Sequence, residues 1–211
     1  MAVYFGPNPE VTSGLIVQLD ATIKASYPGI GTTWYDLSGY RNHATLVNGP
    51  TFNSEKGGSI VFDGIDDIVN SIDASSLTEM TIEIWLYDVR SGQKDILTYN
   101  NDLGSYTFTG SSFRTDGDFL PARFFTIDQE TPNSQWYRFC YVKNGNLYIN
   151  NKKYTGSGSD RTYGILSFGN TRAGINYRLN GKISSIKIYN RSLTDFEILQ
   201  NYNARRGLYY S

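Results

Sequence analysis

Hydrophobic and polar residues alternate along much of this chain, with the period of two expected of β-strands that bury one face. The clearest case is Thr78–Tyr87, TEMTIEIWLY, where every second residue, beginning at Met80, is apolar. Glu83, Trp85 and Tyr87 share the opposite face of the strand. We therefore expect a long central strand here, with its second face against another layer or on an open concave surface.

A second strong pattern predicts a β-hairpin. Two runs rich in Tyr, Phe, Val and Ile flank Asn144-Gly145, a dipeptide that favours a two-residue type I′ turn. The register that this turn implies pairs Lys143 with Asn146, Val142 with Leu147, Tyr141 with Tyr148 and Cys140 with Ile149. Because both faces of the hairpin carry apolar side chains, it is expected to pack within a larger β-structure.

Shorter β-patterns fill much of the remaining chain, and one helix closes it. Strands are expected at Leu15–Asp20, on both sides of a turn within Ser59–Ile72, at Ile165–Gly169, at Thr171–Ile175 and at Gly181–Tyr189. Thr194 and Glu197 have the spacing of a capping box that begins a helix, and Leu193 can pack on Ile198. We expect this helix to end at Gly207.

Composition supports an all-β protein and excludes several classes of function. Aromatic residues make up 15% of the chain, with 17 Tyr and 21 Gly against 2 Met, a balance that favours strands and tight turns. The net charge of −1, without long runs of one sign, argues against a nucleic-acid partner. No segment approaches the roughly 20 apolar residues of a membrane span, and the N-terminus lacks the pattern of a secretory signal. The single cysteine, Cys140, is expected to be a buried and inert thiol.

Residues with candidate chemistry are few. His43 is the only histidine, and without a second metal-binding or catalytic partner it is expected to have a structural hydrogen-bonding role. Asp63, Asp66 and Asp67 fall within one five-residue stretch that is expected to form a turn. Their carboxylates offer oxygen ligands that suit calcium. Asp is also a favourable turn residue, so a purely structural turn is the alternative. We expect that the protein requires no cofactor. A calcium ion is the one candidate for a bound metal.

Six segments of the chain, taken in order, carry a family resemblance. They are LDA, WYDLSGYRNHATL, FDGIDD, TIEIWLY, WYRFCYVKNGNLYINN and GKISSIKIYNRSLTDFEI. Over about residues 14 to 206 this order resembles the laminin-G-like domains of the concanavalin A-like lectin and glucanase superfamily. The resemblance implies an all-β jelly roll, a sandwich of two antiparallel sheets with one short C-terminal helix. We therefore expect an arm at residues 1–13, the domain at 14–206 and a tail at 207–211.

The resemblance leaves the function open, because the superfamily includes lectins, adhesion modules and retaining glucanases. A retaining glucanase needs two carboxylates about 5 Å apart, and TIEIWLY offers Glu83 alone, so we expect no enzymatic activity. A single copy that ends in LTDFEILQNYNARRG is similar to those found in tailed-phage structural proteins. We expect a non-enzymatic virion surface protein, a capsid decoration or a fibre or tail component, made in the host cytoplasm.

The expected partners follow from this assignment. Other virion proteins of the capsid or tail would hold the protein in a multi-copy assembly without membrane insertion, and cell-surface glycans are a second class of partner. Sugars pack on aromatic side chains, for which the candidates are Trp34, Tyr35, Tyr40, Trp85 and Tyr87. Core packing is the alternative role of each. The alternative functions are a calcium-dependent carbohydrate-binding or adhesion module of a cell and, third, a glycoside hydrolase.

Overall fold

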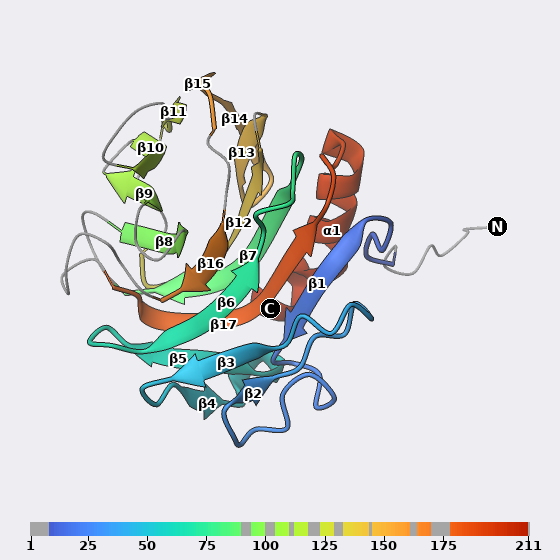
Figure 1. The fold of residues 1–211 in the computed structure, drawn as a ribbon, viewed down its shortest axis with the longest axis vertical. Coiled ribbons are helices and arrows are strands. Elements are labelled where there is room, and N and C mark those ends of the chain that lie inside the picture. Colours follow the sequence, from blue (N-terminus) through green and yellow to red (C-terminus); the bar gives the residue numbers. More distant parts are fainter. Residues whose placement is uncertain are drawn as a thin grey trace.

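Two antiparallel β-sheets face each other in this protein, and one helix lies at its C-terminal end (Figure 1). This arrangement confirms the β-sandwich with one helix that the sequence predicts. The computed structural model describes residues 9–89, 94–99, 104–109, 112–117, 123–128, 133–143, 145–160, 164–169 and 178–210.

The first sheet contains the central strand and supports the helix. Its spatial order is β14 (Lys152–Thr155), β13 (Asn146–Ile149), β12 (Trp136–Val142), β7 (Thr81–Asp88), β17 (Asn180–Tyr189), β5 (Ser59–Asp63) and β4 (Thr51–Asn53). β1 (Leu15–Asp20) pairs with residues 185–189 of β17, whereas β5 pairs with residues 180–183 of the same strand. The predicted central strand, β7, indeed lies between β12 and β17.

The second sheet covers the opposite side of the core. Its spatial order is β15 (Ser157–Gly158), β11 (Arg123–Thr126), β10 (Ser112–Gly117), β9 (Gly104–Thr109), β8 (Lys94–Tyr99), β16 (Ile165–Phe168), β6 (Ile68–Asp73), β3 (Ala44–Val47) and β2 (Thr33–Trp34). A short 3₁₀ helix, η1 (Glu55–Gly57), joins β4 to β5. The turn after β5 crosses from the first sheet to the second. The strand expected at Thr171–Ile175 lies outside the described residues.

The core fills the space between the sheets with aliphatic and aromatic side chains from alternate strand positions. Among its fully buried members are Ile60, Ile82, Ile84, Phe108, Phe113, Phe139, Leu166, Phe168, Ile183 and Ile186. The rings of Phe108 and Phe113 pack with their centroids 4.8 Å apart. Removing this apolar surface from water is the main force that holds the two sheets together.

The predicted hairpin is confirmed, but its register differs by one residue. β12 and β13 pair Phe139 with Ile149, Cys140 with Tyr148 and Tyr141 with Leu147. Because side chains alternate along a strand, this register directs Phe139 and Tyr141 into the space between the sheets. Cys140 and Tyr148 point to the other side, beneath the helix. Burial raises the pKa of Cys140 to about 12, so the thiol is inert, as expected.

The helix α1 (Asp195–Tyr209) begins as the sequence predicts. The Thr194 hydroxyl accepts the backbone N–H of Glu197 at 3.3 Å, and the Glu197 carboxylate accepts the backbone N–H of Thr194 at 2.9 Å. The predicted end at Gly207 is wrong, because the helix continues to Tyr209, whose ring is buried on the first sheet. No helix in the described part of the chain is long and apolar enough to cross a membrane.

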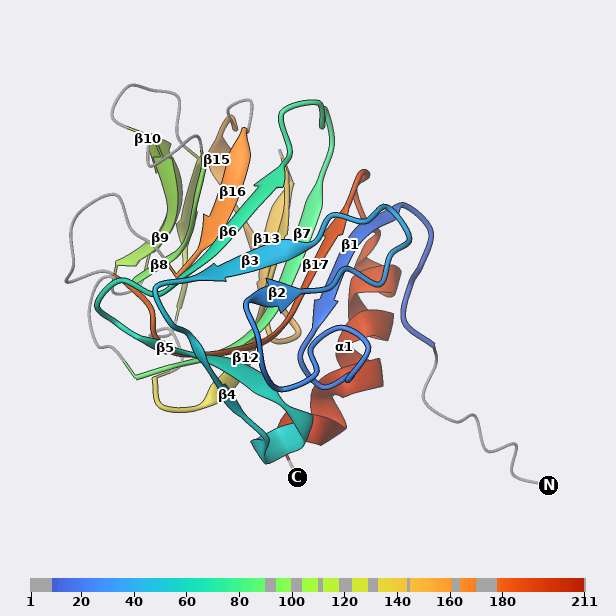
Figure 2. The same cartoon turned by 60° about the horizontal axis from the view of Figure 1, so that its bottom comes forward.

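Trp85 of β7 holds the C-terminal half of α1 on the sheet. Its ring lies nearly parallel to the rings of Tyr202 and Tyr209, at 7° and 17°, with centroids 5.8 and 4.2 Å away. Tyr202 and Tyr209 are seven residues apart, about 10.5 Å along the helix axis, so the indole lies between the two phenol rings. The second face of β7 therefore borders a helical layer. Figure 2 shows this helix alongside β1 and β17.

Charged side chains are buried in the same layer. Arg138 is fully buried and donates hydrogen bonds to the carbonyl oxygens of Ile198 and Asn150, each at 2.6 Å. Glu83 lies 3.6 Å from the Arg138 guanidinium and accepts a hydrogen bond from the Asn201 amide at 3.2 Å. Burying a charged group costs free energy unless such partners offset its lost hydration. The ion pair therefore attaches α1 to the outer face of β7 and β12.

Residues 9–13, which the sequence assigns to an arm, pack against the helix. The backbone N–H of Val11 donates to the Asn201 side-chain oxygen at 2.8 Å, and the Gln200 amide donates to the carbonyl of Pro9 at 2.5 Å. Glu10 forms an ion pair with the buried Lys187. This part of the expected arm thus contacts α1 and β17, and the division of the chain into arm, domain and tail stays a prediction.

Candidate functional site

The loop between β2 and β3 presents aromatic side chains to solvent. In this tyrosine loop, residues 35–43, Tyr40 is 64% exposed and Tyr35 is 43% exposed. Asp36 is buried at the base of the loop. Its side chain accepts the backbone N–H groups of Gln18 at 2.7 Å, Ser38 at 2.9 Å and Asn42 at 2.9 Å. The Asp36 carboxylate therefore ties the loop backbone to β1, which lowers the cost in backbone entropy when a ligand binds the loop.

His43 completes the base of the tyrosine loop. Its Nδ1 accepts the backbone N–H of Asp36 at 3.0 Å, which confirms the predicted structural hydrogen-bonding role. The imidazole also packs edge-on against the Tyr35 ring, with centroids 5.3 Å apart. One face of Tyr35 is thus supported from within the loop.

The structure separates the five aromatic candidates. Trp34 and Trp85 are fully buried, in the core and beneath α1 respectively. The prediction that these two contact a glycan or partner at the surface is wrong, because no ligand can reach them in this fold. Tyr87 is half-buried at the edge of the helical layer, and only Tyr35 and Tyr40 are well exposed.

An aromatic cluster around Tyr87 contains residues that sequence reasoning left out. The Trp136 ring lies 5.9 Å from that of Tyr87 and 4.9 Å from that of Tyr209. Tyr210, 48% exposed, donates its hydroxyl to the Asn150 side-chain oxygen at 2.8 Å. The seven-residue spacing of Tyr202 and Tyr209 could have indicated this cluster from the sequence, since it places both rings on one face of the helix. The cluster combines buried supporting rings with exposed outer ones.

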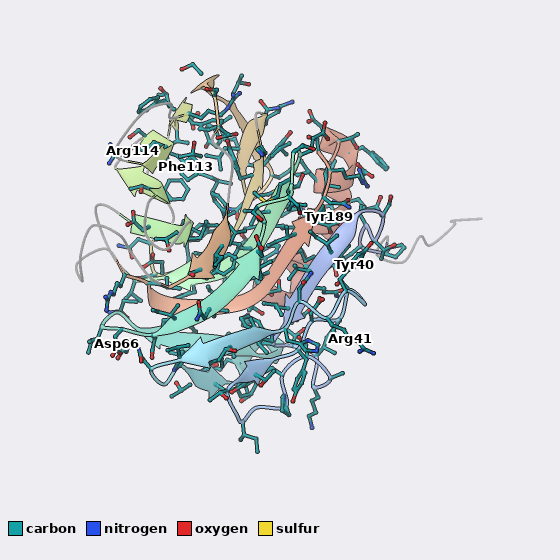
Figure 3. All side chains as sticks on the ribbon, viewed as in Figure 1. Tyr40, Arg41, Asp66, Phe113, Arg114 and Tyr189 are labelled. Atoms are coloured by element: carbon teal, nitrogen blue, oxygen red, sulfur yellow. The ribbon has the colours of Figure 1, made fainter. Side chains whose placement is uncertain are left out.

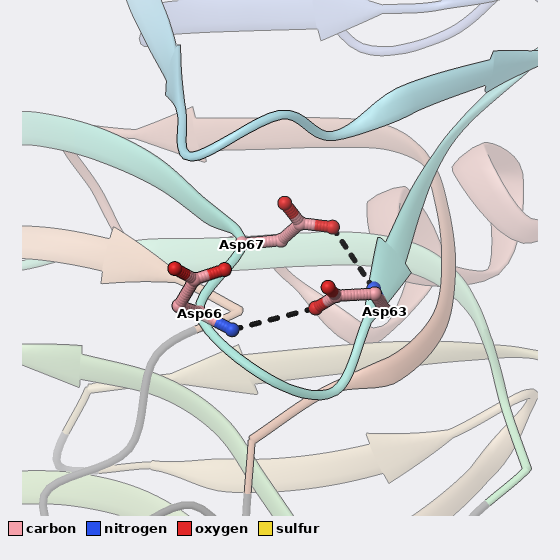
Figure 4. Close-up of side chains that lie close together, drawn as sticks. All are labelled: Asp63, Asp66 and Asp67. Atoms are coloured by element: carbon pink, nitrogen blue, oxygen red, sulfur yellow. Dashed lines mark hydrogen bonds between the residues drawn. The ribbon is translucent and has the colours of Figure 1, made fainter.

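The acidic turn, residues 63–67, brings its three carboxylates together as the calcium hypothesis requires. Asp63, Asp66 and Asp67 each have an oxygen within 4.8 Å of the others (Figure 4). Asp67 accepts the backbone N–H of Asp63 at 2.9 Å, and Asp63 accepts those of Ile65 at 2.7 Å and Asp66 at 3.4 Å. The same bonds make a stable turn without a metal, so the structural alternative stays open.

Electrostatic repulsion accumulates in this turn. Burial raises the pKa of Asp67, and the neighbouring charges of Asp63 and Asp66 raise it further, while the hydrogen bond from Asp63 partly offsets these effects. A cation held between the three carboxylates would remove this repulsion. Such a set of oxygen ligands fits calcium, which takes several at once.

The tyrosine loop and the acidic turn are separate surfaces. Figure 3 shows Tyr40 and Arg41 on one side of the sandwich and Asp66 near the opposite side. A small ligand cannot contact both at once. Any cation at the acidic turn would therefore act through the fold and not by touching a ligand bound at Tyr40.

The two facing sheets and the covering helix define a two-sheet β-sandwich with one helix. No protein-family model matches the chain, and no curated protein matches it in sequence. The chain is similar in structure to Trypanosoma rangeli sialidase in complex with sialic acid, with a TM-score of 0.67, 13% identity, and coverage of 94% of this chain and 34% of that chain.

Two further structures show the same likeness. For the botulinum neurotoxin type G receptor-binding domain the TM-score is 0.64 at 16% identity, covering 90% of this chain and 51% of that one. For the binding domain of Paraclostridial Mosquitocidal Protein 1 the TM-score is 0.62 at 17% identity, covering 89% of this chain and 52% of that one. The chain spans about a third to a half of the length of these structures. Likeness at such identity shows the fold alone.

Proposed function

We propose that this protein is a non-enzymatic binding module that recognises glycans through its tyrosine loop. The observation that carries the proposal is the exposure of Tyr35 and Tyr40 on a loop held by the buried Asp36. Tyrosine combines an apolar ring with a polar hydroxyl, which suits the alternating apolar and hydroxyl surfaces of a sugar. Two of the structural neighbours are named as receptor-binding or binding domains, which supports a binding role.

The position of Glu83 supports a role without catalysis. It is the single acidic residue on β7 between Thr81 and Tyr87, and it is 2% exposed beneath α1. Its carboxylate is engaged by Arg138 and Asn201. Most glycosidases, the retaining glucanases among them, need two carboxylates on either side of the scissile bond, and this carboxylate has no access to a substrate.

We further propose that the module belongs to a virion surface, as a capsid decoration or as a component of a fibre or tail. The support is that a single copy of the domain carrying the run LTDFEILQNYNARRG is similar to those found in tailed-phage structural proteins. Its partners would then be capsid or tail proteins, with glycans of the host cell as ligands. Mass spectrometry of purified phage particles tests this assignment, since a structural component is present in many copies and an unrelated host protein is absent.

Glycan recognition is tested with a double variant, Tyr35→Ala with Tyr40→Ala, on an array of immobilised oligosaccharides. The matched control is Phe196→Ala, which removes an aromatic ring that is 70% exposed on α1. We expect the double variant to lose retention and the control to keep it. Equal retention by wild type and double variant would show that the tyrosine loop is not the site.

A second candidate function is that of a calcium-dependent carbohydrate-binding or adhesion module, and a separate observation favours it. The three carboxylates of the acidic turn lie within 4.8 Å of one another. An ion that binds only the folded state must raise the unfolding midpoint. Thermal unfolding in millimolar calcium and in chelator tests this candidate, and identical midpoints would remove it.

A further inference from the structure

The C-terminal half of α1 separates two hollows that meet at one glycine. One hollow, of about 730 Å³, lies between α1, the segment after β1 and residues 9–10. The other, of about 310 Å³, lies between Tyr202, Arg206 and Tyr210. Gly207 lines both. The exposed Gly207 is therefore a surface residue that the two hollows share.

The fold itself does not explain a glycine at this position. Gly207 lies within α1, where glycine is less favourable than alanine because it loses more backbone entropy. Its backbone is not among those with positive φ. A Cβ added there would meet nothing within 4 Å. The glycine is thus neither a turn residue nor a packing requirement, and what its missing side chain provides is open surface between the hollows.

The smaller hollow offers aromatic surface beside a cation. Tyr202 is held parallel to Trp85, and Tyr210 is held by its hydrogen bond to Asn150, so both rings are fixed in place. Arg206 is exposed next to Tyr202, with its guanidinium carbon 5.9 Å from the ring centroid, and forms no ion pair with a described carboxylate. Its N–H groups can therefore donate to oxygen atoms of a ligand.

The larger hollow offers fixed polar groups among apolar ones. Asp20 and Arg205 form a buried ion pair at its floor, and Thr22 donates its hydroxyl to Asp20 at 2.6 Å. The exposed Asn203 adds an amide, and Leu208 adds apolar surface. Polar groups that are fixed by their own contacts recognise hydroxyl groups without paying for side-chain ordering.

We propose that an oligosaccharide chain lies across α1 at Gly207, with a sugar in each hollow. Apolar sugar faces would pack on Tyr202 and Tyr210, and sugar hydroxyl groups would meet Arg206 on one side and Asn203 on the other. The inference rests on the proposed glycan-binding function and adds a second contact surface to it. Gly207 is the position at which the ligand approaches the helix backbone most closely.

The test compares Gly207→Leu and Gly207→Ala with wild type and with Tyr40→Ala. Retention is measured on an array of neutral and carboxylate-bearing oligosaccharides of two to six sugars, followed by titration calorimetry with the saccharide that is retained best. We expect Gly207→Leu to weaken binding at least about tenfold, or about 1.4 kcal/mol, and Gly207→Ala to weaken it less. Both variants should melt no lower than wild type, because a Cβ at this position meets no atom within 4 Å and helix propensity improves.

Three results would overturn the inference. They are unchanged affinity in Gly207→Leu, a lowered melting temperature in both Gly207 variants, which would make the glycine a structural residue, and no retention of wild type by any saccharide. Loss of binding in Tyr40→Ala with unchanged affinity in Gly207→Leu leaves the proposed function standing without this surface. Loss of binding in Gly207→Leu with unchanged affinity in Tyr40→Ala would support a glycan contact at Gly207 and would show that the tyrosine loop is not a binding site.

Discussion

The tyrosine loop and the acidic turn share one local hydrogen-bond pattern but differ in how fully their carboxylates are hydrogen-bonded. In each, an aspartate accepts the backbone N–H of the residue two positions on, Ser38 for Asp36 and Ile65 for Asp63. Asp36 is buried and both of its oxygens accept hydrogen bonds from the surrounding backbone. In the acidic turn three carboxylates share few donors, and that of Asp66 accepts no hydrogen bond from the described residues.

The difference separates a carboxylate that maintains structure from carboxylates that are available to a ligand. A carboxylate whose oxygens are already hydrogen-bonded gains less from a cation than crowded carboxylates with few donors, because a cation also relieves the repulsion between the latter. The tyrosine loop therefore uses its acid to present aromatic rings. The acidic turn holds three carboxylates together with fewer donors.

The largest expected effect comes from removing Asp36. Asp36→Ala leaves the backbone N–H groups of Gln18, Ser38 and Asn42 without their acceptor, so we expect the free energy of unfolding to fall by about 3 kcal/mol. Urea denaturation measures it. Asp73→Ala is the matched control, because Asp73 bonds Ser75 in an exposed turn, and it should change stability little. A fall for Asp36→Ala no larger than for the control would contradict the structural role of the carboxylate.

The next effect distinguishes the acidic turn as a calcium site. If calcium binds there, a concentration of 100 times the dissociation constant stabilises the folded protein by about 2.7 kcal/mol. Asp67→Asn should abolish this gain, whereas Asp73→Asn should keep it. Differential scanning calorimetry with calcium and with chelator gives the comparison. A calcium response that survives in Asp67→Asn would place the ion elsewhere.

A smaller effect is expected from pH in the absence of calcium. Burial and the charges of Asp63 and Asp66 raise the folded-state pKa of Asp67. A carboxyl group shifted in this direction contributes its stability below its unfolded pKa of about 3.9 and loses it as pH rises through the folded value. Wild type should therefore lose stability relative to Asp67→Asn over this rise. Urea titrations in chelator across this pH range test it, and parallel curves would refute the repulsion.

The smallest effect on stability is expected at the tip of the tyrosine loop. Tyr40 is 64% exposed, so Tyr40→Ala should change the free energy of unfolding by less than about 0.5 kcal/mol. Under the proposed function the same variant weakens glycan binding. Urea denaturation combined with array retention separates the two effects. A large loss of stability would show that Tyr40 is part of the fold and not a contact residue.

Local features of this protein followed from its sequence. The alternation in Thr78–Tyr87 predicts β7, the spacing of Thr194 and Glu197 predicts the start of α1, and the acidic turn keeps its carboxylates together. Each depends on interactions between residues a few positions apart, so the sequence alone specifies them. The jelly-roll resemblance placed these elements in two sheets, which the structure confirms.

Only the tertiary structure decided which aromatic residues are available. Trp34 and Tyr35 are neighbours on opposite faces of the chain, and Trp34 is buried while Tyr35 is exposed. Trp85 faces away from the sandwich core but is covered by α1. Alternation shows that adjacent side chains point apart, but which side is covered depends on segments more than a hundred residues away. Burial is a property of the assembled layers, and the local pattern of the chain does not contain it.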